Sequence, residues 1–227
     1  MNDDLKRAAA LRAVEYVRDG MTVGLGTGST AQYAVRELGR RVREDGLRIR
    51  GVPTSDRTAA LATEVGIPLV TLEACPRLDV TIDGADELVI DTLDAIKGMG
   101  GALLHEKIVA LATEEEILVL DESKVVSRLG DHTSVPVEVV SFGWSRTRDA
   151  LRTLGCEPVL RLADTGEQFI TDSGNLLIDC RFPPIEDPYA LAAEIKAITG
   201  VVDHGLFLGI ARRAIVAGAS GIREINM

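Results

Sequence analysis

The stretch MTVGLGTGSTAQYAVREL, residues 21–38, joins a short β-branched run to a helical pattern through a loop of three glycines and three hydroxyls. It predicts a strand-to-helix turn, because apolar residues recur after the loop at helical spacing: Ala31, Ala34, Val35 and Leu38. Such a turn places backbone N–H groups at a helix N-terminus, where a phosphate is favoured. An ordinary βα turn with Ser29 or Thr30 as N-cap explains the same residues. The loop contains neither G-x-G-x-x-G nor a P-loop, so it does not indicate a nucleotide.

Outward from this stretch, the first 120 or so residues alternate short β-branched runs with helical stretches. This alternation is typical of a parallel sheet covered by helices on both faces. We expect strands near residues 21–25, 47–52, 67–70, 79–83, 93–97 and 117–121, and helices at 4–18, 30–42, 56–65 and 102–113. A late run, AIVAG at 214–218, is a candidate for one more strand of the same sheet.

The pattern changes after residue 130. We expect strands at 135–140, 157–162, 176–180 and 201–206, helices at 145–154 and 188–198, and a hairpin through TDSGN at 171–175. Two βαβ-like halves around a hairpin predict a small ferredoxin-like (split βαβ) α+β domain. The predicted fold is therefore α/β, with a doubly wound, mostly parallel Rossmann-like sheet in residues 1–130 and 206–227, and a smaller α+β domain in residues 131–205.

Composition excludes several partners. The 227 residues carry a formal net charge of −10, which argues against binding to nucleic acid or to an anionic membrane. Cys75, Cys156 and Cys180 lie outside any C-x-x-C motif, so we expect reduced thiols in the cytoplasm and no disulfide framework. The three histidines form no ligand cluster, so we expect no metal. The N-terminus lacks the apolar core of a signal peptide, and apolar runs are too short to span a membrane.

Two carboxylates follow the predicted strand at 79–83. In DVTIDGADELV, Asp83 and Asp86 lie three residues apart across Gly84. An Asp-Gly pair is most often a turn. In open α/β sheets, however, ligands bind beyond the carboxyl ends of strands, where this loop and GTGST should both emerge. Two carboxylates at that edge could bind sugar hydroxyls and exchange protons with them.

A second glycine-rich loop, in IKGMGGALLHEKIVA at 96–110, opens a helix that is apolar almost all round. Its Glu106 lies either on a thin solvated stripe or against a cleft. In DESK, residues 121–124, Lys124 is either a solvated lysine beside a helix cap or a group at the same sheet edge. Lys6 and Arg7 are weaker candidates for contact with an anion, because they fit the polar face of the first helix.

Five motifs in this order resemble the type A ribose-5-phosphate isomerases: GLGTGSTAQYAVRELG at 24–39, DGADE at 83–87, IKGMGGALLHEKI at 96–108, DESKVV at 121–126 and PVEVV at 136–140. The resemblance covers nearly the whole chain, including TDSGNLLIDC at 171–180 and GVVDHGLFLGIA at 200–211. It implies interconversion of ribose 5-phosphate and ribulose 5-phosphate in the pentose phosphate pathway. It also implies a homodimer that uses no metal or organic cofactor.

The resemblance implies roles for individual residues. Glu106 would be the proton acceptor, because a single carboxylate can move a proton from C2 to C1 through an enediolate. Asp83 and Asp86 would hold sugar hydroxyls and assist ring opening, and the division of these roles between them stays open. Lys97 and loop amides would stabilise the charge on oxygen. The family usually has KGGG where this chain has KGMG, so Met99 departs from the pattern. The implied substrate-binding residues are Thr27, Gly28, Ser29, Thr30, Asp83, Gly84, Ala85, Asp86, Lys97, Gly98, Met99, Gly100 and Lys124.

Two alternatives keep the fold and change the function. The first is a related sugar-phosphate deaminase or transferase, and the second is a non-catalytic sugar-phosphate sensor. Formation of a ketose from ribose 5-phosphate in buffer alone would separate the isomerase from both.

Overall fold

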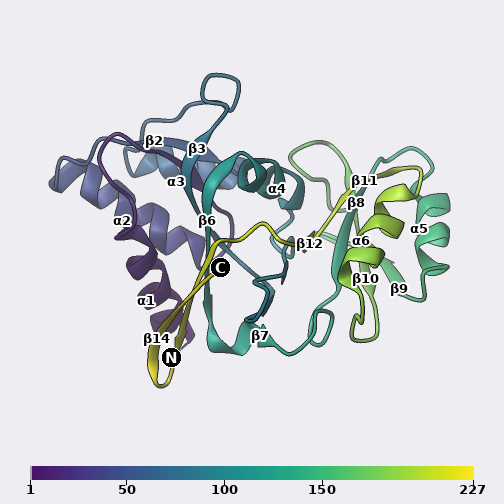
Figure 1. Ribbon diagram of the computed structural model, residues 1–227. Helices are drawn as coiled ribbons and strands as arrows, with labels where there is room; N and C mark the ends of the chain where they lie inside the picture. The colour runs from purple at the N-terminus through teal and green to yellow at the C-terminus, as the bar shows by residue number, and fades with distance from the viewer. Residues whose placement is uncertain (1) are drawn as a thin grey trace.

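A computed structural model describes residues 2–227, and its centre is a six-stranded sheet (Figure 1). Five strands run parallel, and the last forms an antiparallel hairpin at one edge. In spatial order they are β14 (Gly221–Asn226), β13 (Arg213–Gly218), β6 (Thr113–Asp121), β3 (Leu78–Gly84), β1 (Thr22–Leu25) and β2 (Arg50–Pro53). The predicted return of residues 214–218 to this sheet is confirmed, whereas β14 was not predicted.

Helices cover both faces of the large sheet. On one face, α1 (Asn2–Val14), α2 (Ala31–Glu44) and α3 (Asp56–Glu64) pack on alternate strand residues such as Val23, Ile82 and Ile117. On the other face, α4 (Leu103–Leu111) contributes Ala110 to a cluster with Leu118. Because the sheet is covered on both sides, the second half of β6, ILVL at residues 117–120, is apolar without alternation and fully buried. The predicted doubly wound α/β fold is confirmed.

Two predicted strands lie elsewhere than expected. The run at 93–97 is displaced from the large sheet, because the chain turns back at Leu93, whose φ is 55°. The segment pairs instead in a separate sheet with the order β12 (Leu206–Phe207), β5 (Ala95–Ile96), β4 (Glu87–Val89) and β7 (Val125–Val126). The run at 67–70 makes one bridge, between Leu69 and Gly51, because Pro68 has no N–H to extend a ladder.

A smaller antiparallel sheet follows, with the order β11 (Val201–His204), β8 (Val135–Val139), β10 (Leu176–Arg181) and β9 (Glu157–Leu160). The helices α5 (Trp144–Arg152) and α6 (Pro188–Ala197) lie together on the side away from the large sheet (Figure 1). Asp187 caps α6 by accepting the Ala190 N–H at 3.0 Å. Chain order and strand order together are those of the split βαβ motif, which confirms the smaller α+β unit. Its boundaries at residues 131 and 205 stay a prediction.

The longest helix within residues 2–227, α2, has 14 residues, and no helix there combines the length and apolarity that a membrane span requires.

Candidate active site

A cavity of about 120 Å³ opens where the carboxyl ends of β1, β3 and β6 meet. This is the edge at which open α/β sheets bind ligands. Most of the predicted site residues line it: Thr27, Gly28, Ser29, Thr30, Gly84, Ala85, Asp86, Lys97, Gly98, Gly100, Glu106 and Lys124. Asp83 and Met99 are not among the lining residues, and Lys6, Leu120 and Asp121 are lining residues that the list of predicted contacts did not contain.

The first loop, residues 27–30, runs from β1 into α2. Gly28 has a φ of 107°, a backbone conformation that residues with a side chain rarely adopt. Thr30 occupies the N-cap position of α2, but its hydroxyl accepts no capping hydrogen bond. Ser29 Oγ instead accepts a hydrogen bond from Lys6 Nζ at 3.1 Å. The loop therefore brings a helix N-terminus, two hydroxyls and an ammonium to one side of the cavity.

Thr27 has a different surrounding from its neighbours. Its hydroxyl is buried in a network with Thr54 at 2.7 Å, Ser55 at 2.8 Å and Thr58 at 3.2 Å. These partners belong to the next strand-to-helix loop and to α3. Ser55 is also the N-cap of α3. The Thr27 side chain therefore ties two neighbouring loops of the sheet edge together.

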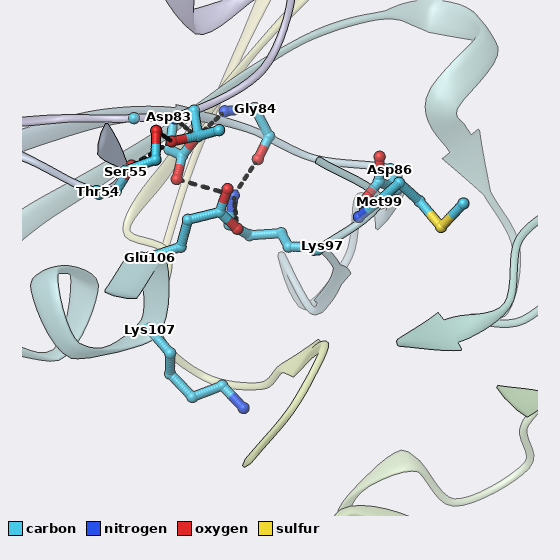
Figure 2. A network of polar contacts seen from close by, with 12 residues as sticks. Thr54, Ser55, Asp83, Gly84, Asp86, Lys97, Met99, Glu106 and Lys107 are labelled. Carbon is cyan, nitrogen blue, oxygen red and sulfur yellow. Dashed lines mark hydrogen bonds and ion pairs between the residues drawn. The ribbon is translucent and has the colours of Figure 1, made fainter. Parts of the chain in front are cut away.

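A buried charge cluster lies beneath the loops (Figure 2). Lys97 Nζ is 2.9 Å from Asp83 Oδ2 and 3.4 Å from Glu106 Oε2, and it donates to the Gly84 carbonyl at 2.5 Å. The side chains of these three charged residues are at most 3% exposed. Glu106 reaches the cluster from α4, which confirms that it faces a cleft and not solvent. One ammonium thus serves two carboxylates.

The backbone fixes both ends of the Lys97–Asp83 pair. Asp83 Oδ1 accepts hydrogen bonds from the N–H groups of Thr27, at 3.0 Å, and Gly84, at 2.7 Å. The Lys97 N–H donates to the Gly205 carbonyl at 2.9 Å. A Cβ on Gly26 would lie 2.3 Å from Asp83 Oδ1, so the strand end must be glycine for the carboxylate to fit.

Burial and charge set the protonation of the cluster. Burial, reinforced by the charges of Asp83 and Asp86 and opposed by Lys97, raises the pKa of Glu106 to about 8. Burial also raises the pKa of Asp83, against the pull of Lys97. Burial lowers the pKa of Lys97, but the neighbouring carboxylates outweigh it and the net shift is upward. Lys97 therefore stays an ammonium while Glu106 titrates close to neutrality.

Glu116 adds a further buried carboxyl group that sequence reasoning missed. It lies on β6, is 2% exposed, and neither carboxylate oxygen has a hydrogen-bond partner within the described residues. Burial, and after it the charge of Asp83, raises its pKa well above the ordinary value. The available signal was a glutamate directly before the apolar run ILVL, on a strand predicted to be buried.

The second glycine-rich loop positions Met99. Gly98 and Gly101 have φ values of 106° and 86°, whereas Met99 is not in the left-handed region. The Met99 N–H donates to Asp86 Oδ2 at 3.0 Å, and 46% of the residue is exposed, with its side chain directed away from the cluster (Figure 2). The methionine is therefore accommodated without backbone strain.

The third loop follows β6. Asp121 caps the short helix η1 (Glu122–Lys124) by accepting the Ser123 N–H at 3.1 Å, which confirms the predicted cap. Lys124 nevertheless lines the cavity, so the cap and the site coincide. No group of three or more His, Cys, Asp or Glu side chains in residues 2–227 is arranged to hold a metal ion.

Known proteins of one family are similar to this chain along almost its whole length. The family model described as ribose 5-phosphate isomerase A (phosphoriboisomerase A) matches residues 50–221. Ribose-5-phosphate isomerase A of Gloeobacter violaceus (strain ATCC 29082 / PCC 7421) is 55% identical over 224 residues, which cover 99% of this chain and 96% of that protein. The corresponding protein of Synechococcus sp. (strain JA-3-3Ab) is 51% identical, with 99% and 97% covered.

Solved structures agree over the same length. Ribose 5-phosphate isomerase A from Methanocaldococcus jannaschii superposes with a TM-score of 0.95 at 42% identity, with both chains covered completely. A D-ribose-5-phosphate isomerase in complex with phospho-erythronic acid superposes with a TM-score of 0.97 at 36% identity, again over the whole of both chains.

Proposed function

We propose a residue-level mechanism from the premise that the chain belongs to the ribose 5-phosphate isomerase A family and interconverts ribose 5-phosphate and ribulose 5-phosphate. The reaction moves a proton from C2 of the open-chain aldose to C1, and a hydroxyl proton between the two oxygens. It therefore needs a base beside C1 and C2 and a donor beside the carbonyl oxygen.

Glu106 is the base in this proposal. The observation that carries it is a carboxylate that lines the cavity and is 3% exposed, and whose one partner within residues 2–227 is the Lys97 ammonium, 3.4 Å from Oε2. Asp86 and Asp121 also line the cavity, but both accept backbone N–H groups. A pKa of about 8 suits a group that takes a proton from C2 as a carboxylate and returns it to C1 as an acid.

Lys97 and the Gly100 N–H stabilise the enediolate oxygen. Lys97 is held as an ammonium by Asp83, and it lines the cavity while Asp83 does not. We therefore assign Asp83 to orienting Lys97 and the Thr27 amide. Asp86 remains at the cavity surface and binds sugar hydroxyls, including the one released on ring opening. Removal of one donor to a developing oxyanion typically costs about 2.7–4 kcal/mol.

The phosphate binds at the N-terminus of α2. The Ser29 and Thr30 hydroxyls, the amides of the loop, and the ammonium groups of Lys6 and Lys124 line the same cavity. Each feature favours an anion, and together they give an acidic protein a local basic site.

Glu106→Gln tests the assignment of the base. The change keeps the volume of the side chain and removes the proton acceptor, so kcat for ketose formation should fall at least about a hundredfold. Inorganic phosphate, followed by thermal shift, should bind as it does to wild type, because its proposed site consists of the α2 loop, Lys6 and Lys124 and does not include Glu106. A kcat within a few-fold of wild type would show that Glu106 is not the base.

Three coarser properties complete the proposal. We propose that the protein works in the cytoplasm, in the non-oxidative pentose phosphate pathway, as a homodimer without metal or organic cofactor. Its buried free thiols, Cys75, Cys156 and Cys180, support a reducing compartment. The pathway and the dimer rest on the family. Gel filtration with light scattering tests the dimer, and activity that survives a chelator tests the absence of a metal.

A further inference from the structure

An arginine beside the smaller sheet donates hydrogen bonds to the second glycine-rich loop. Arg161 follows β9, and its Nη1 donates to the carbonyl of Gly98 at 2.9 Å and to that of Met99 at 3.1 Å. Asp179 on β10 fixes the guanidinium, accepting Nε at 2.9 Å on one oxygen and Nη2 on the other. The two side chains are 11% and 21% exposed, so the contact is largely shielded from solvent.

The segment that Arg161 contacts, residues 98–101, is a β-turn whose middle peptide can adopt two orientations. The Gly101 N–H donates to the Gly98 carbonyl at 3.0 Å, which closes a turn over residues 98–101. Type I and type II turns differ chiefly by a flip of the middle peptide, and type II requires a positive φ at the third residue. That residue is Gly100, and glycine adopts either sign of φ readily. The turn itself therefore leaves the orientation of its middle peptide open.

In the structure, the amide side of the turn faces the cavity. Gly100 does not have a positive φ, so the turn is not type II. All described peptide bonds are trans, so each N–H points opposite the carbonyl of its own peptide. The peptide between Gly98 and Met99 shows this directly, because its carbonyl accepts a hydrogen bond from Arg161 Nη1 at 2.9 Å and its N–H donates to Asp86 Oδ2 at 3.0 Å. The next peptide has its carbonyl on Arg161 and its Gly100 N–H on the opposite side, where Gly100 lines the cavity.

We propose that Arg161 is a positioning residue of the isomerase: it holds the middle peptide of the turn so that the Gly100 N–H, and not the Met99 carbonyl, faces the enediolate. A flipped peptide would lose its hydrogen bond to Arg161 and would present a carbonyl dipole to a developing anion. The inference rests on the proposed function, in which a loop amide stabilises the oxyanion.

Arg161→Gln tests the inference, with Arg148→Gln as the matched control. Arg148 pairs with Asp149 on α5 of the same unit and does not line the cavity. The readouts are kcat, KM, and binding of two probes by calorimetry: phospho-erythronic acid, which has a carboxylate at the reacting end, and inorganic phosphate. We expect Arg161→Gln to lower kcat about 10- to 100-fold and to weaken phospho-erythronic acid about tenfold, with phosphate binding unchanged. Arg148→Gln should leave all four values at those of wild type.

Several outcomes overturn the proposal. If Arg161→Gln keeps kcat and binding of phospho-erythronic acid within twofold of wild type, the arginine does not position the turn. Equal weakening of both probes would make Arg161 a structural residue. If Arg161→Gln is insoluble, Asp179→Asn decides, because it leaves the guanidinium present but unfixed. It should show the same selective weakening at a smaller size, and wild-type behaviour of Asp179→Asn rules the proposal out.

Chemical rescue gives an independent check. Arg161→Gly should regain part of its lost kcat when guanidinium ion is added, whereas sodium at equal ionic strength should restore none. Rescue by both salts alike would point to a general ionic effect and contradict the proposal. Binding of the two probes needs no turnover, so this test stays readable even if Glu106→Gln proves active and the assignment of the base fails.

Discussion

Buried carboxylates in two regions of the molecule are treated in opposite ways. Glu87, completely buried on β4, accepts backbone N–H groups from Gly130, His132 and Thr133, each at 2.6 Å. Glu106, almost equally buried on α4, shares the single ammonium of Lys97 with Asp83 and accepts no backbone N–H group from the described residues. Glu87 therefore holds the backbone of residues 130–133, which leads into the smaller sheet, whereas Glu106 faces the cavity.

Depth of burial does not separate the two carboxylates, because both are at most 3% exposed. A carboxylate whose oxygens accept several backbone N–H groups is committed to holding the backbone. A buried carboxylate that has no amide donors and only a share of one cation is less well stabilised as an anion, so its pKa rises toward neutrality. Satisfaction of hydrogen bonds, more than depth, therefore separates a structural acid from a reactive one.

The largest expected effect is the loss of stability when Glu87, the structural carboxylate, is replaced. Glu87→Gln places an amide NH₂ where a carboxylate oxygen accepted N–H groups, so at least one buried donor loses its acceptor. We expect the free energy of unfolding to fall by about 3 kcal/mol. For a chain of this size, that corresponds to a loss of roughly 6–12 °C in Tm.

Thermal denaturation followed by circular dichroism measures that loss, and Glu106→Gln is the control that should lose little or none. Activity per folded molecule of Glu87→Gln should stay within a few-fold of wild type. A variant with unchanged Tm and a large loss of kcat would reverse the assignment of Glu87.

The next largest effect is the pH dependence of kcat/KM, which is set by Glu106. Glu106 must be ionised to take the C2 proton, and its pKa is about 8, so activity requires a rise in pH through that value. The ionised fraction of such a group increases about tenfold between pH 7 and pH 9, and kcat/KM should follow it. Initial rates in buffers of constant ionic strength check this. A profile that is flat from pH 7 to pH 9 would show that Glu106 is already ionised in the free enzyme.

The smallest expected effect is a pH-dependent gain in stability when Glu116, a third buried carboxyl group, is replaced. Its pKa is raised in the folded protein, so the folded state keeps a proton that the unfolded chain releases above about pH 4.5, and stability declines as pH rises beyond that point. Glu116→Gln removes this penalty. We expect a gain of about 1 kcal/mol, or roughly 2–4 °C in Tm, at pH 8 and little change at pH 5. An equal shift at both pH values would contradict the linkage to a proton.

Much of the large sheet could be predicted because its signals are local. The β-branched run before GTGST and the helical spacing after it specify a strand, a turn and a helix within 18 residues. The rule that parallel strands present their carboxyl ends at one edge then brings the loops at Thr27, Asp86 and Lys124 together. The side of α4 on which Glu106 lies was left open, since an almost uniformly apolar helix gives no preferred face.

What could not be predicted depends on contacts between distant segments. Nothing in EPVLRL marks Arg161 as a partner of Gly98, because the register between the smaller sheet and the loop is set only when the two pack. The displacement of residues 93–97 into a separate sheet follows from a left-handed Leu93, a conformation that leucine rarely adopts and no pattern signals. The pairing of Lys97 with Asp83 likewise needs the fold, so the sequence suggested both as site residues without indicating that they form an ion pair.

The two contacts that hold the second glycine-rich loop have a consequence for how the molecule is made. The Lys97 N–H is bound by Gly205 and the turn by Arg161, and both partners lie far toward the C-terminal end of the chain. A nascent chain that has formed only its first βα units lacks both restraints, so its loops and strands are present but the active site is not assembled. Such long-range contacts are the late ones in folding. During refolding, activity should therefore return only when the smaller sheet docks on the loop. The helices should form before that step.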